Sequence, residues 1–272
     1  MSVSARRIVR DECPQPPLVL KSGEIHLWLA FYDEIADERL HAAYRDLLDP
    51  AEREQEPRFY FAADRRRYLV TRALVRTVLS RYLPVEPAGW RFSANAYGRP
   101  TLANPALGGR GVSFNISHTH SLIVLGVASG GELGVDVENF AARSVSIEIA
   151  DRYFSPTEVA ALARVPPQQQ QYRFFEYWTF KEAYIKARGM GLSLPLDKFS
   201  FQYPNDGAVQ LSICPELNDD AARWRLWQFR PRAEYLVAVC AQRTRASTLI
   251  VRQVVPMLSE RMLAPRFLRT SE

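Results

Sequence analysis

The chain has 272 residues, 47% of them hydrophobic and 24% charged, which is ordinary usage for a globular protein with a sizeable core. No apolar run reaches the about 20 residues of a membrane span, no secretory signal is visible, and the three cysteines form no paired motif, so we expect a cytoplasmic protein without a disulfide scaffold. The formal net charge of +5 favours anionic partners, although it is equally typical of a protein that is merely soluble.

The first half of the chain is predicted to form strands around one long helix. After an irregular segment at 1–23, alternating apolar residues predict a strand at 24–32. Asp49 and Pro50 are typical of a helix start, and the periodicity of residues 64–83 predicts a longer helix. A short strand with a turn at 89–100, and strands at 112–117 and 121–128, complete this half.

The second half follows a similar order. Gly130 and Gly131 predict a hairpin turn into a strand at 132–138. Ser155 and Glu158 have the spacing of a capping box, residues 166–171 are expected to be flexible, and residues 172–189 predict a strong helix that ends at Gly189. Residues 192–201, 223–229 and 234–242 are rich in strand formers, whereas the basic, poorly patterned residues beyond 256 predict a loosely ordered tail.

The two halves also share a spacing of aromatic and apolar residues. Two related α/β halves at 24–131 and 132–245, followed by a partly disordered extension at 246–272, explain this pattern, and chance similarity between amphipathic strands is the alternative. The first repeated set is Trp90, Phe92 and Gly98, which reappears as Phe199, Phe201 and Gly207; the second is Phe114, Ile116, Ile123 and Val124, echoed by Trp227, Phe229, Leu236 and Val237.

The segment 133–138 carries two carboxylates on one predicted face of a strand. Side chains alternate along a strand, so Gly134, Asp136 and Glu138 share the face opposite the apolar residues. Two neighbouring carboxylates repel each other unless a cation lies between them, and Mg²⁺ is a cation that takes one or two such ligands together with phosphates. Gly134 leaves room on that face for a bulky ligand. The alternative is an edge strand with two solvated acids.

Glu182 and Lys186 are four residues apart in the predicted helix, so they share one face. An ordinary surface ion pair is the alternative. The bulky residues around them leave the helix little polar surface, which favours a seam or a cleft as their place.

Further polar residues are predicted to gather at the edge of the first sheet. Asn115, Ser117 and His118 end a strand with potential hydrogen-bond donors, and a single imidazole suits a phosphate better than a metal. A turn presents Arg99, and the long helix presents Arg67 within the triplet 65–67, for which a solvated helix face is the alternative.

Taken in order, these motifs resemble the 4′-phosphopantetheinyl transferase superfamily, and specifically its larger, surfactin-synthetase-activating (Sfp) type. The resemblance spans about 24–245. It implies an α+β fold of two similar α/β subdomains related by pseudo-twofold symmetry, each a small, mostly antiparallel sheet packed on a long helix. The matching motifs are Tyr97-Gly98-Arg99-Pro100, Phe114-Asn115-Ile116-Ser117-His118, Gly134-Val135-Asp136-Val137-Glu138 and Trp178-Thr179-Phe180-Lys181-Glu182, the last continuing through Lys186 to Leu192.

The resemblance also implies a reaction. The enzyme would move the phosphopantetheine arm of coenzyme A (CoA), bound between the halves, onto a serine of an acyl or peptidyl carrier protein and release adenosine 3′,5′-bisphosphate. Asp136, Glu138 and Glu182 would hold Mg²⁺, and Lys186 would bond the phosphate. With Asp136 and Lys186, Glu182 is an expected catalytic residue, and either Glu182 or a metal-bound water would be the base.

The expected CoA contacts follow from the same resemblance. Arg67 and His118 would contact the 3′-phosphate. Arg99, Pro100, Asn115 and Ser117 would lie near the nucleotide, in addition to Asp136, Glu182 and Lys186. The chain departs from some relatives in one respect, because 52–56 reads Glu-Arg-Glu-Gln-Glu where they have lysines.

A monomer is expected, with a basic surface for an acidic carrier, and the segment 140–149 with Arg143 is the proposed docking region. The class of carrier stays open. One alternative is a catalytically silent homologue that only binds carriers, but all the expected ligands are present. The other is a nucleic-acid-binding protein or nuclease, which the scattered arginines do not favour.

Overall fold

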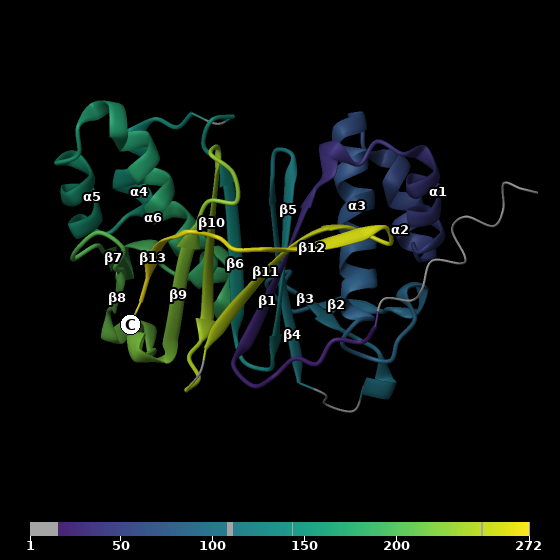
Figure 1. Cartoon of the computed structure of the whole chain (residues 1–272). Coiled ribbons are helices and arrows are strands. Elements are labelled where there is room, and N and C mark those ends of the chain that lie inside the picture. The colour runs from purple at the N-terminus through teal and green to yellow at the C-terminus, as the bar shows by residue number, and fades with distance from the viewer. Residues whose placement is uncertain (1–15, 108–110, 143, 246, 272) are drawn as a thin grey trace, which may run out of the picture.

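The computed structural model describes residues 16–107, 111–142, 144–245 and 247–271. Two larger sheets stand together in the middle of the molecule and helices cover their outer sides (Figure 1). The five-stranded sheet has the order β12-β11-β1-β5-β4 and the four-stranded sheet the order β13-β9-β10-β6. Except for the parallel pair β1–β11, their neighbouring strands are antiparallel.

The elements have the following bounds. The first sheet contains β1 (Glu24–Phe31), β4 (Val112–Thr119), β5 (Leu122–Ser129), β11 (Thr248–Val255) and β12 (Ser259–Leu263). The second contains β6 (Leu133–Asn139), β9 (Trp224–Phe229), β10 (Tyr235–Gln242) and β13 (Phe267–Thr270). Two small hairpins are β2 (Phe92–Ala94) with β3 (Pro100–Leu102), and β7 (Phe199–Gln202) with β8 (Gln210–Ile213). The helices are α1 (Glu38–Asp46), α2 (Pro50–Gln55), α3 (Ala62–Leu79), α4 (Ala150–Tyr153), α5 (Pro156–Ala163) and α6 (Pro167–Arg188).

The chain uses the same arrangement twice. A strand, a long helix, a small hairpin and two antiparallel strands occur first as β1, α3, β2–β3, β4 and β5, and then as β6, α6, β7–β8, β9 and β10. In each sheet the last strand of the unit lies between the other two, as β1-β5-β4 and as β6-β10-β9. The predicted α+β fold of two similar halves is confirmed.

Three hydrophobic clusters hold these layers together. One lies between the first sheet and α1 and α3, a second between the other sheet and α6, and a third between the inner faces of the two sheets. β1 takes part in two of them, because Leu27 and Leu29 point to the other sheet while Trp28 and Ala30 point to the helices. Burial between two sheets within one chain therefore fixes the two halves against each other.

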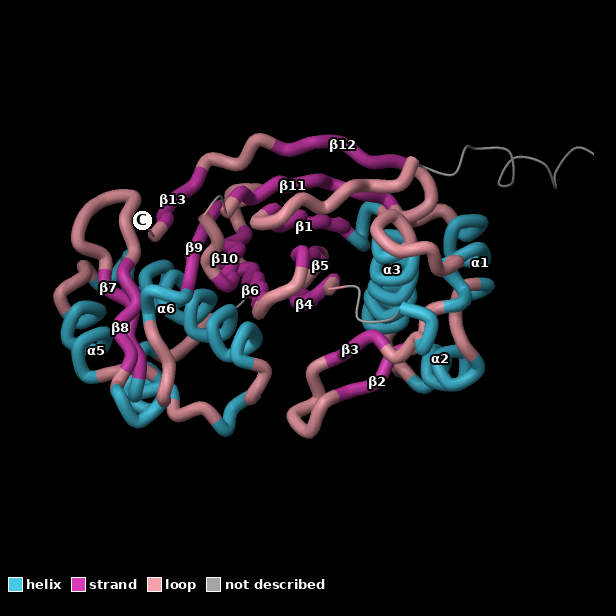
Figure 2. Tube along the Cα trace, turned by 90° about the horizontal axis from the view of Figure 1, so that it is seen from below, coloured by secondary structure: helices cyan, strands magenta, loops and turns pink. Residues whose placement is uncertain are grey.

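The C-terminal extension differs from the expected loosely ordered tail. Its strands β11 and β12 extend the first sheet and β13 then joins the second, so the segment runs across both halves (Figure 2). Its apolar residues serve different cores, since Val251 packs between the sheets and Val254 packs on the helical side. The partner strands β1 and β9 are distant in sequence, so local patterning gave little indication of them.

Some local predictions need adjustment. α6 starts at Pro167, so the glutamines expected to be flexible form its first turn, where proline at the first position and helix-forming glutamine are compatible with a helix. α1 and β8 were not predicted. α3 ends at Leu79, earlier than expected. The capping boxes at Asp49 and Ser155 are present, and Gly189 ends α6 in a left-handed conformation with φ of 66°.

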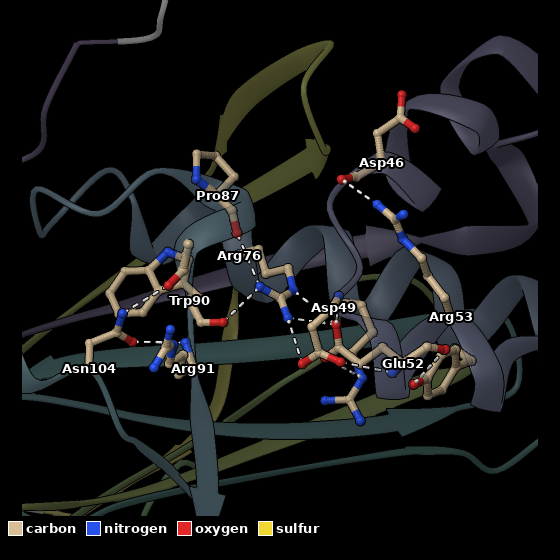
Figure 3. Close-up of polar contacts among 12 residues, drawn as sticks. Asp46, Asp49, Glu52, Arg53, Arg76, Pro87, Trp90, Arg91 and Asn104 are labelled. Atoms are coloured by element: carbon tan, nitrogen blue, oxygen red, sulfur yellow. Dashed lines mark hydrogen bonds and ion pairs between the residues drawn. The ribbon is translucent and has the colours of Figure 1, made fainter.

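Two acids of the segment 52–56 form ion pairs inside the first half, and Figure 3 shows that of Glu52 with Arg76. Arg76 is fully buried and its Nη2 lies 2.6 Å from Glu52 Oε2, while its Nη1 donates to the carbonyl groups of Pro87 and Trp90. Glu56 accepts from Arg45 Nε at 2.9 Å. Glu52 holds α2 against α3, and Glu56, which directly follows α2, holds it against α1, so the departure from the lysines of some relatives has a structural role.

Candidate functional site

The two carboxylates of β6 face helix α6 as the alternation predicts. Leu133, Val135 and Val137 pack between the sheets, which places Asp136 and Glu138 on the opposite side. Asp136 is 5% exposed and Glu138 is 8% exposed. The alternative of two solvated acids on an edge strand is therefore wrong.

Gly134 has a different role from the one expected. A Cβ at this position would lie 1.9 Å from the carbonyl oxygen of Ala183 and 2.4 Å from the amide nitrogen of Ala187. Both atoms belong to the backbone of α6, so the space above Gly134 holds the helix and leaves none for a ligand. The glycine lets α6 approach β6 closely enough for the side chains of the two elements to meet.

Lys186 meets Asp136 at this contact. Its Nζ lies 2.6 Å from Asp136 Oδ1 and donates to Ser117 Oγ at 2.9 Å. The Ser117 hydroxyl donates to the same Asp136 oxygen at 3.0 Å. The other carboxylate oxygen of Asp136, Oδ2, is buried without a hydrogen-bond partner among the described residues. The predicted helical pair therefore belongs to a cleft between α6, β6 and β4.

Glu182, one turn before Lys186 on α6, also lies close enough to Asp136 to interact with its negative charge. Burial, together with the negative charge of Asp136, raises the pKa of Glu182 to about 7, although Lys186 acts in the opposite direction. Burial penalises the charged form and a like charge adds to that penalty. The cleft therefore carries closely spaced carboxylates that a cation would stabilise.

The expected metal ligands nevertheless do not form a complete cluster. Within the described ranges, no group of three His, Cys, Asp or Glu side chains is placed to hold a metal ion. In this structure the ammonium group of Lys186 neutralises Asp136. The donor chemistry still fits a hard cation, because the side chains are carboxylates and Asp136 keeps an unpartnered oxygen. The set Asp136, Glu138 and Glu182 stays a prediction.

Side chains of β4 join the two halves at the cleft. β4 and β6 lie beside each other, and Asn115 Oδ1 accepts from the Val135 amide at 2.9 Å. Thr119 Oγ1 accepts from the Asn139 amide at 3.1 Å. With Ser117 between them, these residues occupy alternate positions of one strand face. Thr119 was missed by sequence reasoning, although its period-two spacing from Asn115 and Ser117 was a usable signal.

His118 and Arg67 supply positive or hydrogen-bonding groups beside the carboxylates. His118 is exposed on one side, yet desolvation by the surrounding protein, with Arg67 and then Lys186 nearby, lowers its pKa. Arg67 is paired with Asp64 at 3.0 Å. Tyr32, another residue that sequence reasoning missed, is close enough to Arg67 for that arginine to oppose the rise of its pKa. Arg65 is exposed, as a solvated helix face requires.

A pocket of about 270 Å³ opens between the halves. Among the residues expected to bind the nucleotide, Arg99, Pro100 and Asn115 line it, and Glu182 and Lys186 line its other side. Ser117, His118 and Arg67 lie outside this lining and connect to it through Lys186 and Asp136. Both halves of the chain therefore contribute to one concave site.

Lys181, the neighbour of Glu182, is placed away from the cleft. Its Nζ lies 2.8 Å from Glu158 Oε2, and both side chains are fully buried. The same Nζ donates to the carbonyl groups of Leu196 and Phe199. This lysine ties α6 to α5 and to the segment before β7, so its role is structural.

Comparison with known proteins agrees with these features. A family model described as "4′-phosphopantetheinyl transferase superfamily" matches residues 132–240, and one described as "4′-phosphopantetheinyl transferase, N-terminal" matches residues 36–130. A 4′-phosphopantetheinyl transferase of Bacillus subtilis is 37% identical over 78% of this chain and 92% of its own length. The transferase Sfp of Bacillus subtilis is 34% identical over 78% of this chain and 89% of its own.

Two further matches are more limited. The transferase HetI of Nostoc is 36% identical over 66% of this chain and 75% of its own length. The solved holo-[acyl-carrier-protein] synthase of Thermotoga maritima is 19% identical, the match covers 42% of this chain and 64% of that one, and the TM-score is 0.34. Of the helices in the described ranges, none is long and apolar enough to cross a membrane. Because its sequence is 34% identical to that of Sfp and matches both family models, the chain belongs to the 4′-phosphopantetheinyl transferase superfamily and is of the Sfp type.

Proposed function

We propose that this protein transfers the 4′-phosphopantetheine group of CoA to a serine hydroxyl of an apo carrier protein, with release of adenosine 3′,5′-bisphosphate. The observation that carries the proposal is the convergence of Glu182, Lys186 and Asp136 at a pocket built from both halves of the chain. Relatives of this chain are named as transferases of this kind, which supports the reaction type. We infer that it works as a monomer, because one chain supplies both sides of the site; a cytoplasmic location stays a prediction.

The carboxylates and the lysine have distinct parts in this proposal. Asp136, Glu138 and Glu182 would hold Mg²⁺, which when bound offsets negative charge on the pyrophosphate of CoA. The serine oxygen forms a bond to the phosphorus that bears the pantetheine arm, and the bond from that phosphorus to the bridging oxygen breaks. A carboxylate oxygen of Glu182 accepts the serine proton. Lys186 Nζ donates to the departing phosphate, where negative charge develops.

The remaining contacts orient CoA. Arg67 and His118 bind the 3′-phosphate in this proposal, since Arg67 and Lys186 both lie close enough to His118 for their charges to lower its pKa. Ser117 and Asn115 hold β4 and Asp136 in place through the hydrogen bonds already described. Pro100 forms part of the pocket wall. Arg99 lines the same pocket, but two carbonyl groups already accept from its guanidinium group, which leaves fewer N–H groups for a nucleotide.

The segment after β6 is the proposed docking region for an acidic carrier. Val145, Ile147 and Ile149 pack partly against the second core, whereas Ser144 and Ser146 are exposed between them. Arg143, the expected basic contact, lies outside the described residues. Replacing Ile147 would disturb the core, so Ser144→Glu and Ser146→Glu are the sharper tests. Both should weaken carrier binding by charge repulsion, and unchanged affinity in both would exclude this surface.

The transferase itself is tested by mass spectrometry. The full-length protein is incubated with CoA, Mg²⁺ and a panel of apo carriers from fatty-acid, polyketide and nonribosomal-peptide systems. The expected result is a mass increase of one phosphopantetheine unit in at least one carrier, greatly reduced with Glu182→Gln. If no carrier gains mass while carriers still bind, the protein is instead a silent carrier-binding homologue. An undiminished rate with Glu182→Gln would refute the assigned base.

A further inference from the structure

The tip of the β2–β3 hairpin, in the first half, contacts the end of α6, in the second half. Arg99 Nη1 donates to the carbonyl oxygen of Ala187 at 3.0 Å, and Nη2 donates to that of Leu133 at 3.1 Å. Asn95 Nδ2 donates to the carbonyl oxygen of Gly189 at 2.9 Å. The hairpin tip is turned toward this end of α6 in Figure 2. Three hydrogen bonds therefore connect one turn to the end of α6 and the start of β6.

The turn is prearranged for these contacts. Asn95 Oδ1 accepts from the amides of both Tyr97 and Arg99 at 2.9 Å. Gly98 takes a φ of 81°, and its amide donates to the Asn95 carbonyl group. Because these bonds lie within the turn, they fix the backbone from which the Arg99 side chain extends.

The acceptors make the contact directional. Carbonyl groups in the last turn of a helix lack partners within the helix and carry partial negative charge, so a cation with N–H donors is favoured there. A guanidinium group can donate to two acceptors at once, whereas an ammonium group cannot reproduce this planar fork. Gly189 packs directly on the clamp, because a Cβ there would lie 3.1 Å from Arg99 Nη1.

We propose that Arg99, assisted by Asn95, is a positioning residue that clamps the first half onto the end of α6 and the start of β6. Ala187 directly follows Lys186, and Leu133 lies three residues before Asp136. The clamp therefore sets the separation between the helix that carries Glu182 and Lys186 and the strand that carries Asp136. The catalytic consequence rests on the proposed function, whereas the clamp itself is a property of the protein without CoA.

Amide hydrogen exchange of the protein without CoA tests whether Arg99 positions α6 or instead only contacts the nucleotide. The Gly189 amide donates to the Ile185 carbonyl oxygen at 3.0 Å and so reports on the last turn of α6. Arg99→Lys and Asn95→Ala should each speed exchange at this turn by about tenfold, with the rest of the protein unchanged. Arg91→Lys, an exposed arginine in the same hairpin region, is the matched control and should leave exchange unchanged.

Kinetics give the second readout. Displacing Lys186 by about 1 Å should lower kcat by about tenfold to a hundredfold for Arg99→Lys, with a smaller loss for Asn95→Ala. The KM for CoA should stay within about twofold of the wild type, because the guanidinium group of Arg99 donates to two backbone carbonyl groups, although the residue lines the pocket.

Three outcomes would overturn the clamp. The first is a raised KM for CoA with unchanged exchange in the variants, which would identify Arg99 as a nucleotide contact. The second is faster exchange throughout the molecule, which would show a general loss of stability, and the third is unchanged exchange together with unchanged kinetics. If no carrier is modified by the wild type, the exchange experiment still decides the clamp, so its failure is distinguishable from failure of the proposed function.

Discussion

Gly134→Ala is a small substitution for which the structure predicts a large effect. A methyl group at this position would lie 1.9 Å from the backbone oxygen of Ala183, whereas real Cβ contacts are essentially never under 3.0 Å. The obstacle is the backbone of α6, so no side-chain rotation can relieve it. Helix α6 must move away from β6 by about 1 Å, because close-packed interiors do not absorb such an overlap locally.

The displacement has two measurable consequences. Overpacking of this kind costs about 1–3 kcal/mol of unfolding free energy. The Lys186–Asp136 contact, 2.6 Å in the native protein, would open by a comparable distance, and a misplacement of about 1 Å can reduce kcat by about a hundredfold. We therefore expect a folded but less stable enzyme whose rate falls far more than its folded fraction.

The assay combines urea denaturation with carrier modification under conditions where both proteins are folded. Gly89→Ala is the matched control, because a Cβ there meets only Val85 Cγ1 at 3.6 Å, an ordinary contact. It should change neither stability nor rate. A Gly134→Ala protein with native stability and native kcat would show that the close approach of α6 to β6 does not position the site.

Three other predictions concern the ion pair, the pH response and the metal. Lys181→Met alone should cost about 3–5 kcal/mol of unfolding free energy by leaving Glu158 buried and unpaired, and Lys181→Met with Glu158→Leu should recover most of it in urea denaturation. Burial, and secondarily Arg252, lowers the pKa of His26 from 6.5 to about 4. The contribution of neutral His26 to the unfolding free energy is therefore complete above pH 6.5 and should fall by up to about 3 kcal/mol as the pH approaches 4. His26→Gln should make the unfolding free energy less dependent on pH in this range. EDTA should abolish carrier modification and excess Mg²⁺ should restore it; full activity in EDTA would contradict the carboxylate assignment.

Sequence patterns predicted the elements that local chemistry determines. The alternation in β6 placed Asp136 and Glu138 correctly, and the spacing of Glu182 and Lys186 correctly placed both on the cleft side of α6. Burial and the approach of distant elements were harder to predict. Gly134 was interpreted as space for a ligand because nothing in the local sequence shows that α6 packs on it.

The C-terminal strands illustrate the same limit on a larger scale. β11 pairs with β1, more than 200 residues earlier in the chain, and β13 pairs with β9. Arg269 of β13 is also paired with Glu176 of α6 at 3.1 Å, and both side chains are buried. Pairing over such distances depends on which edges the folded halves leave open, and the sequence of the segment itself carries little of that information.

The repeated architecture accounts for the presence of carboxylates in only one half. The spacing that relates the two halves makes Leu125 of β5 equivalent to Ala238 of β10. Leu125 pairs across the strands with Trp28, and Ala238 pairs with Asp136, so Trp28 corresponds to Asp136. By the same register, Ala30 corresponds to Glu138, and His26 corresponds to Gly134. Trp28 and Ala30 pack on the helical core of the first half, where carboxylates would be buried without a cation.

Each half therefore serves the single cleft in a different way. The second half provides the acids on β6 and the long helix that approaches them across a glycine. In the first half, a histidine occupies the place of that glycine and bonds Tyr82 at 2.7 Å, which leaves no comparable close approach. The first half instead contributes Arg67, His118 and the β2–β3 hairpin, which donates hydrogen bonds to the end of α6. The proposed function agrees with this asymmetry, because the anionic substrate would lie between acids and a cation on one side and basic groups on the other, whereas two identical halves would present the same charge to it twice.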